Sequence, residues 1–262
     1  MQRVNLKPDT LDQENRGFAQ AVLREPVFLN SVPKSGSHLL RNIVRMFVPV
    51  SQQYQRQFVQ FANLEEHRQA FNQDLPMLSW GHLPFADEPA IELKGVRKIL
   101  LVRDPYSWVL ARARFFVSDE FEGNLDLLKE GKLTAEELMN LMIFGIHQRA
   151  PSLLEIYTHN AVAWLGTGVH QVRYEELVGH LKALDTPAAE TYFAALLGAC
   201  GIELPSDWRE RIRIGSDPAQ SGTARENLST KTGLEFPPEL PDVQRRLVDY
   251  AVPGLRALLG YE

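Results

Sequence analysis

The sequence has very little cysteine: Cys200 stands alone among 262 residues. One cysteine excludes a disulfide within the chain and any zinc or iron–sulfur site built on several cysteine ligands. It also fits a protein from a reducing compartment. We therefore expect Cys200 to be an ordinary core residue.

Long apolar runs are missing as well. No stretch approaches the ~20 apolar residues that a membrane-spanning helix requires. Residues 1–16 are polar and of mixed charge, unlike the apolar centre of a secretory signal. The sequence thus predicts a cytoplasmic protein with no transmembrane segment.

An excess of positive charge is also absent. The chain has 28 Lys and Arg against 33 Asp and Glu, which gives a formal net charge of −5. A basic field over the whole chain is excluded, and we predict no nucleic-acid partner. No internal repeat and no shift in composition divides the chain. We therefore predict a single domain over residues 1–262.

Short apolar runs alternate with helical patterns along the chain. This alternation predicts an α/β fold with a central, mainly parallel sheet flanked by helices. Strands are predicted at 26–32, 77–82, 98–102 and 169–172, and helices at 38–47, 105–117, 134–149, 152–165, 186–201 and after 241. Residues 202–240 are rich in Gly, Pro and polar residues, so they are predicted to be mostly loop.

The loop Pro33–His38 joins the first predicted strand to the first long helix. A loop at this place exposes unpaired backbone N–H groups at a helix N-terminus, where they favour an anion. Lys34 adds positive charge, and Gly36 allows a close approach of the backbone. An ordinary strand–helix turn would use the same residues, and the loop lacks the Walker A spacing.

Two further residues follow predicted strands. Arg103 comes directly after the apolar run 98–102, where open α/β sheets bind ligands, and an arginine fork suits a phosphate. His82 ends the run 77–82 among aromatic residues and could act as a general base. Each has an ordinary alternative: Arg103 as a solvated strand cap and His82 as a structural histidine.

Together these segments resemble the PAPS-dependent sulfotransferases, where PAPS is 3′-phosphoadenosine 5′-phosphosulfate. The run Pro33-Lys-Ser-Gly-Ser37 is similar to their phosphosulfate loop, and Leu100-Leu-Val-Arg-Asp-Pro105 to their 3′-phosphate motif. Gly81-His82-Leu83-Pro84 resembles the segment with their catalytic histidine. Val172-Arg-Tyr-Glu-Glu-Leu177 looks like the strand whose tyrosine lies near the adenine. The order of the four segments agrees with the family.

The resemblance implies transfer of a sulfuryl group from PAPS to a hydroxyl or amine of a small-molecule, lipid or sugar acceptor. It assigns the leaving oxygen to Lys34 and deprotonation of the acceptor to His82. The donor would be bound by Lys34, Ser35, Gly36, Ser37, His38, Arg103 and Tyr174. The loop would be P-loop-like, and no metal would be required if Lys34 and the loop amides neutralise the charge.

Several positions depart from the family pattern. Ala111 replaces a serine that contacts the 3′-phosphate, and Arg112 or Arg114 could compensate. Leu39 replaces a tryptophan that stacks on adenine, and Trp80 a lysine. The C-terminal Arg-Lys-Gly run is not evident. Its nearest substitutes are Ser221-Gly-Thr-Ala-Arg225, from which we predict Arg225 as a donor ligand, and Lys231-Thr-Gly233.

Two other functions remain open at this point. A degenerate relative would bind a nucleotide without catalysis, and an ATP-dependent kinase would share the broad architecture. The missing Walker A loop disfavours the kinase. Residues 53–75 and 115–150 are the candidate walls of the acceptor pocket. The sequence does not specify the acceptor or the oligomeric state.

Overall fold

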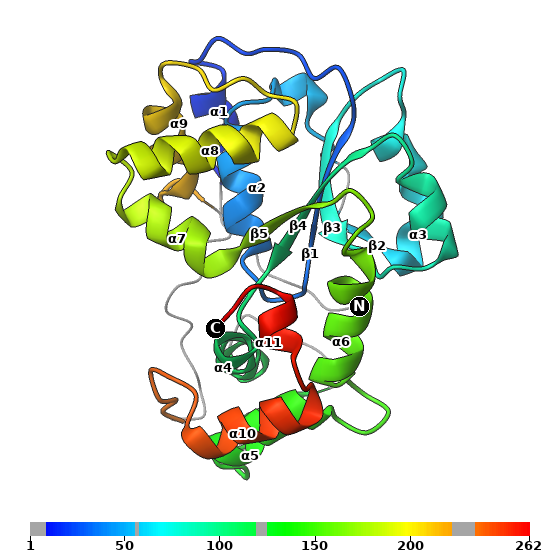
Figure 1. Ribbon diagram of the computed structural model, residues 1–262, viewed down its shortest axis with the longest axis vertical. Helices are drawn as coiled ribbons and strands as arrows, with labels where there is room; N and C mark the ends of the chain where they lie inside the picture. Colours follow the sequence, from blue (N-terminus) through cyan, green and yellow to red (C-terminus); the bar gives the residue numbers. More distant parts are fainter. Residues whose placement is uncertain (1–8, 56–57, 119–124, 222–233) are drawn as a thin grey trace. The chain divides into compact units, whose positions relative to one another are not determined.

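The computed structural model describes residues 9–55, 58–118, 125–221 and 234–262. They fall into two compact units (Figure 1). The sheet unit comprises the described residues of 7–102 and 159–224. The helical unit comprises those of 103–158 and 225–262. The predicted single-domain organisation stays a prediction.

The sheet unit is built on five parallel strands in the order β2-β3-β1-β4-β5. The strands are β1 (Val27–Ser31), β2 (Val59–Gln60), β3 (Leu78–His82), β4 (Arg97–Val102) and β5 (His170–Arg173). Central β1 pairs in parallel with β3, Asn30 opposite Gly81, and with β4, Ser31 opposite Leu101. The predicted α/β class and parallel sheet are confirmed.

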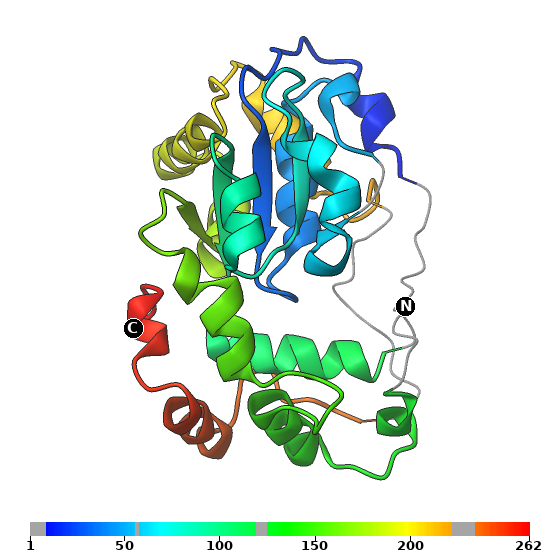
Figure 2. The same cartoon turned by 90° about the vertical axis from the view of Figure 1, so that its right-hand side faces the viewer.

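The two faces of the sheet are covered by different helices. Val27 and Leu29 of β1 belong to the buried core that also holds residues of α2, α8 and α9. Phe28 points to the opposite face, because side chains alternate along a strand, and its ring meets Phe71 edge-on at 5.4 Å. Figure 2 shows α3 and the short 3₁₀ helices in front of the strands on that side.

The described residues of the sheet unit also form several α-helices. They are α1 (Leu11–Asn15), α2 (Ser37–Arg45), α3 (Asp87–Glu92), α7 (Tyr174–Lys182), α8 (Pro187–Ala199) and α9 (Trp208–Ser216). Short 3₁₀ turns occupy Val50–Gln52, Phe61–Asn63, Glu65–Phe71 and Val162–Trp164. Cys200 follows α8 and is 1% exposed, so its place in the core is confirmed.

Residues 202–240 are mostly loop among the described positions, as predicted. The helix α9 lies within them and packs its buried Trp208 and Ile212 into the core. The polar residues Asn42 and Arg45 of α2 are buried as well. Both are 3% exposed, since Asn42 donates to the Ser221 hydroxyl and Arg45 pairs with acidic residues.

The helical unit contains α4 (Pro105–Phe116), α5 (Ala135–Phe144), α10 (Asp242–Ala251), α11 (Leu255–Leu258) and most of α6 (Leu153–Asn160). A 3₁₀ turn, η4, occupies Asp126–Lys129. α4 starts at a proline, which suits the first turn. The predicted capping box of α5 is present: Thr134 accepts from the Glu137 amide. α5 ends at Phe144 instead of 149 because Gly145 takes a positive φ of 85°.

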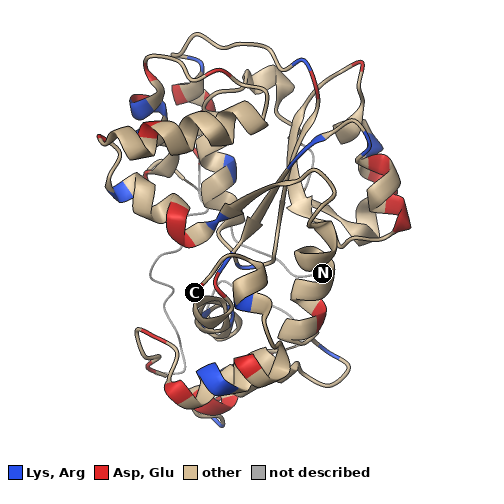
Figure 3. Cartoon of the chain, viewed as in Figure 1, with Lys and Arg blue, Asp and Glu red and all other residues tan. Residues whose placement is uncertain are grey.

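Charge is distributed over several elements in the view of Figure 3, with acidic segments on α3 and α10. Among the described residues, no helix has both the length and the apolar composition to span a bilayer.

Candidate functional site

The predicted anion loop connects the carboxyl end of β1 to the first turn of α2. Lys34 and Gly36 both have positive φ, 70° and 93°. Tyr174, the first residue of α7, closes the loop from the side: a Cβ at Gly36 would lie 2.5 Å from its ring. Gly36 is therefore required both by backbone conformation and by the close approach of Tyr174.

Polar groups of this loop are available to a ligand. Among the described residues, the Gly36 and Ser37 amides donate to no other backbone group. The Ser35 hydroxyl is buried and has no hydrogen-bond partner there. Unpaired donors at the N-terminus of a nine-residue helix form a site suited to a phosphate or sulfate group. This fits the predicted use of Ser35, Gly36 and Ser37.

His82 is tied to this loop by hydrogen bonds through Ser31. Its Nδ1 lies 2.9 Å from the Ser31 carbonyl oxygen and 3.0 Å from the Ser31 hydroxyl. The Ser31 hydroxyl in turn donates to the Ser37 hydroxyl at 2.9 Å. Because a carbonyl only accepts, Nδ1 carries the proton and Nε2 keeps its lone pair. The strand that leads into the loop thus fixes the orientation of the imidazole.

The backbone after His82 is also held in place. The buried Asn30 side chain donates to the Leu83 carbonyl at 3.0 Å and accepts from the Leu83 amide at 2.9 Å. The indole of Trp164 donates to the same carbonyl at 2.9 Å. These three bonds fix the chain that carries His82, which is what a positioned base requires.

The electrostatics keep His82 neutral. Burial, followed by the positive charge of Lys34, lowers the pKa of the His82 imidazole to about 3. The Lys34 effect shows that the two predicted catalytic residues lie within electrostatic reach of each other. At pH 7 the imidazole is therefore neutral.

An aromatic wall flanks His82 on the same face of the sheet. It consists of His38 from α2, Phe58 before β2 and Trp80 of β3. Phe58 meets Trp80 at a centroid distance of 4.7 Å and His82 at 4.5 Å. His38 meets Trp80 at 4.8 Å. The predicted site residue His38 is thus placed against Trp80, at the edge of the loop.

Arg103 follows β4 directly in the chain and belongs to the helical unit. Its Nε donates to the Ser107 hydroxyl at 3.0 Å, and its carbonyl accepts from the Tyr157 hydroxyl at 2.8 Å. The next residue, Asp104, caps α4 and accepts two bonds from Arg256 at 3.0 and 2.9 Å. The turn that carries Arg103 is therefore braced by α4, α6 and α11.

The two arginines expected to replace the missing serine at Ala111 have other partners. Arg112 is 4% exposed and donates to the carbonyls of Met142 and Pro151 at 3.1 and 2.8 Å. Arg114 donates to the Pro237 carbonyl at 2.9 Å. Arg112 is thus a structural residue, and its proposed compensation is not supported. Arg225 and Lys231–Gly233 lie outside the described residues.

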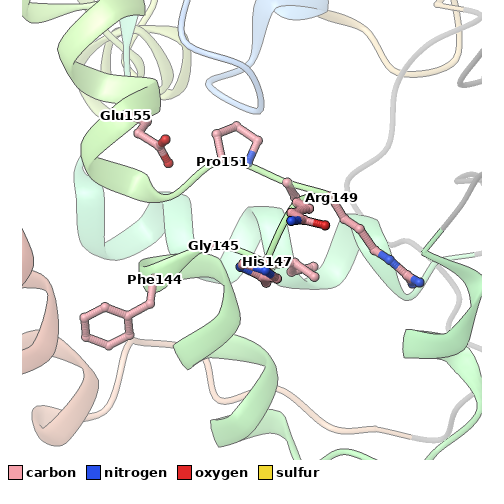
Figure 4. Close-up of a pocket in the computed structure, with 9 residues that line it drawn as sticks. Phe144, Gly145, His147, Arg149, Pro151 and Glu155 are labelled. Atoms are coloured by element: carbon pink, nitrogen blue, oxygen red, sulfur yellow. The ribbon is translucent and has the colours of Figure 1, made fainter.

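Each of the two stretches expected to line an acceptor pocket borders a hollow. One of about 420 Å³ lies at the turn between α5 and α6, beside Phe144, His147, Arg149 and Glu155 (Figure 4). Another of about 450 Å³ is lined by Tyr54 and several amide side chains. Gln53, which also lines this hollow, forms a β-bridge with Leu78. Leu78 lies at the opposite end of β3 from His82.

The structure brings the loop with Lys34, His82 and Tyr174 together at the carboxyl ends of the strands, and their roles stay predictions. Sequence reasoning missed Ser31, Asn30 and Phe58. Ser31 could have been found from the sequence, because one serine precedes the loop and another, Ser37, ends it. The contribution of Phe58 depends on β2, a two-residue strand with no clear sequence pattern.

Comparisons with known proteins identify the fold. No family model and no curated protein sequence matches the chain. The crystal structure of mouse sulfotransferase SULT7A1 complexed with PAP matches 98% of this chain and 94% of its own at 15% identity, with a TM-score of 0.57. The crystal structure of retinol dehydratase in complex with androsterone and the inactive cofactor PAP matches 92% of this chain and 82% of its own at 13% identity, with a TM-score of 0.49. The chain has the fold of the PAPS-dependent sulfotransferases.

Proposed function

We propose that this protein transfers a sulfuryl group from PAPS to a hydroxyl or amine of a small-molecule, lipid or sugar acceptor. The observation that carries the proposal is the Ser31 bridge. It connects the imidazole of His82 to the Ser37 hydroxyl at the anion loop through contacts of 2.9–3.0 Å. A base and an anion site are thereby held together, as a transfer between two oxygen atoms requires.

The proposed step is an in-line substitution at sulfur. His82 Nε2 takes the proton of the acceptor hydroxyl as its oxygen bonds to sulfur. The bond between sulfur and the bridging phosphate oxygen breaks, which releases adenosine 3′,5′-bisphosphate (PAP). Lys34 and the loop amides stabilise the charge that develops on the leaving oxygen. No step calls on a metal, and the predicted independence from metals stays a prediction.

The described residues fit the donor at its 5′ end. The buried, unpartnered Ser35 hydroxyl and the Gly36 and Ser37 amides offer donors to the phosphosulfate. We assign Tyr174 to the nucleotide, because its ring borders the loop at Gly36. Arg103 is assigned to the 3′-phosphate from its sequence motif.

A non-catalytic nucleotide-binding protein is the second candidate. Ala111 offers no hydroxyl, and Arg112 is committed to two backbone carbonyls. The loss of one charge-assisted hydrogen bond weakens donor binding by about 1.5–3 kcal/mol. A kinase has no comparable support. We retain the predicted cytoplasmic location as a proposal.

Transfer of label from [³⁵S]PAPS to a panel of phenols, alcohols and amines tests the proposal. The wild-type protein is expected to label at least one acceptor class without added divalent metal. Lys34→Ala and His82→Ala are expected to lose most of this transfer. Arg213→Ala, which removes an exposed arginine of the same unit paired with Asp185, is expected to lose none of it. Binding of PAP without any transfer would favour the non-catalytic candidate.

A further inference from the structure

Arg41 lies against Trp80 of the aromatic wall, on the same side of α2 as Ser37 of the loop. It follows Ser37 by four residues, so the two side chains share one helix face, and side chains tilt toward the helix N-terminus. Its guanidinium carbon is 4.9 Å from the centroid of the Trp80 ring. Trp80 and His82 are two residues apart on β3 and therefore point to the same face of the sheet.

The charge of Arg41 is only partly balanced. Arg45, one turn further along α2, takes both nearby carboxylates, Asp9 at 2.8 Å and Asp12 at 2.6 Å. Among the described residues, Arg41 forms no ion pair of its own. Burial and the charge of Arg45 lower the pKa of Arg41 to about 10, and the two aspartates raise it by less. Arg41 is therefore still charged at neutral pH, as a half-buried cation.

The wall borders the core, where Trp80 packs, and is itself only partly buried. His38, Phe58, Trp80 and His82 are all partly exposed, as is Arg41. Ring faces favour a flat, apolar body, and a desolvated guanidinium favours a carboxylate. A cation beside an aromatic surface next to the base therefore selects for a particular kind of acceptor.

We propose that the acceptor is a hydroxylated aromatic compound that carries an acidic group. Its ring lies against the aromatic wall, its hydroxyl faces His82 and its acidic group pairs with Arg41. This inference rests on the proposed sulfuryl transfer and specifies its substrate class. The phosphosulfate is assigned to Lys34 and the loop amides, so Arg41, which reaches over Trp80, is assigned to the acceptor.

A matched pair of probes separates charge from shape. 4-Hydroxybenzoate carries the carboxylate, and its methyl ester presents the same ring and hydroxyl without the charge. The wild-type protein is expected to have a higher kcat/KM for the acid. Arg41→Met is expected to lower kcat/KM for the acid by about 10- to 100-fold, and for the ester less than about 3-fold. Arg41→Lys should keep part of the preference.

Two measurements keep other effects apart. Calorimetric titration with PAP should give the same affinity for wild type and Arg41→Met, and thermal unfolding checks that the variant is folded. Arg213→Met, which removes an exposed arginine paired with Asp185, is the matched control and should leave both probes unaffected.

Three results would overturn the inference. The acid could be used no better than the ester, Arg41→Met could affect both equally, or neither compound could be sulfated by a protein that binds PAP. A parallel loss of PAP affinity in Arg41→Met would assign Arg41 to the donor instead. If PAP does not bind even to the wild type, the proposed function itself fails.

Discussion

Replacing Gly36 by alanine tests the contact between the anion loop and Tyr174. The residue has a φ of 93°, where an L-residue costs about 1–2 kcal/mol. The new Cβ would also lie 2.5 and 2.6 Å from two atoms of the Tyr174 ring. Relieving such overpacking typically costs a further 1–3 kcal/mol. We therefore expect Gly36→Ala to lower the free energy of unfolding by about 2–5 kcal/mol.

Gly166→Ala is the matched control, because Gly166 has a φ of 76° but nothing within 4 Å of its Cβ position. It should show only the backbone cost of about 1–2 kcal/mol. In a double-mutant cycle of Gly36→Ala with Tyr174→Ala, the removed clash should appear as a coupling energy of about 1–3 kcal/mol.

Urea unfolding measures these free energies, and calorimetry measures PAP binding. Gly36→Ala is expected to weaken PAP binding at least 10-fold and Gly166→Ala not at all. If the two variants had the same stability and the same PAP affinity, Tyr174 would not pack against the loop and its place in the donor site would be wrong.

Three further predictions follow from single contacts. Arg256→Met should lower the free energy of unfolding, measured in urea, by about 1–3 kcal/mol, a range discounted for the partial exposure of the Arg256–Asp104 pair. Arg256→Lys should lower it by less. Unchanged stability in both variants would show that Arg256 does not stabilise the turn at Asp104. By NMR, His82 should stay neutral down to pH 5, since its pKa is about 3, and PAP should raise that pKa by offsetting Lys34; titration near pH 6.5 in the free protein would be inconsistent with burial. Burial raises the pKa of Cys200 to about 12, so it should not react with a disulfide reagent at pH 8 until urea unfolds the protein; fast labelling of the native protein would refute this.

The parts of the fold that were predicted from sequence are those with strong local signals. β1, β3 and β4 are apolar runs that end in Pro or polar residues, and α4 begins at Pro105. A parallel sheet then brings the strand ends together, which is why Lys34, His82 and Tyr174 could be grouped in advance.

The parts that were missed depend on contacts distant in sequence. α9 carries Arg209, Arg211 and Arg213 and reads as polar, yet Gly215 allows it to pack closely on the Asn42 backbone of α2. From the sequence, Arg112 could bind a ligand or stabilise the fold. Its hydrogen bonds to the Met142 and Pro151 carbonyls show that it stabilises the fold. Arg41 was missed because its contact with Trp80 joins α2 to β3, and local sequence patterns do not predict that these two elements lie side by side.

The central proposal is that this protein binds a 3′,5′-bisphosphate nucleotide, with the loop at Lys34 assigned to its 5′ end and Arg103, from its sequence motif, to its 3′-phosphate. Calorimetric titration with PAP beside ADP, on the wild type and on Arg103→Ala, tests it without knowledge of the acceptor. The account predicts micromolar binding of PAP, weaker binding of ADP, and loss of the preference in Arg103→Ala. Equal affinity for PAP and ADP, or no binding of either, would contradict it.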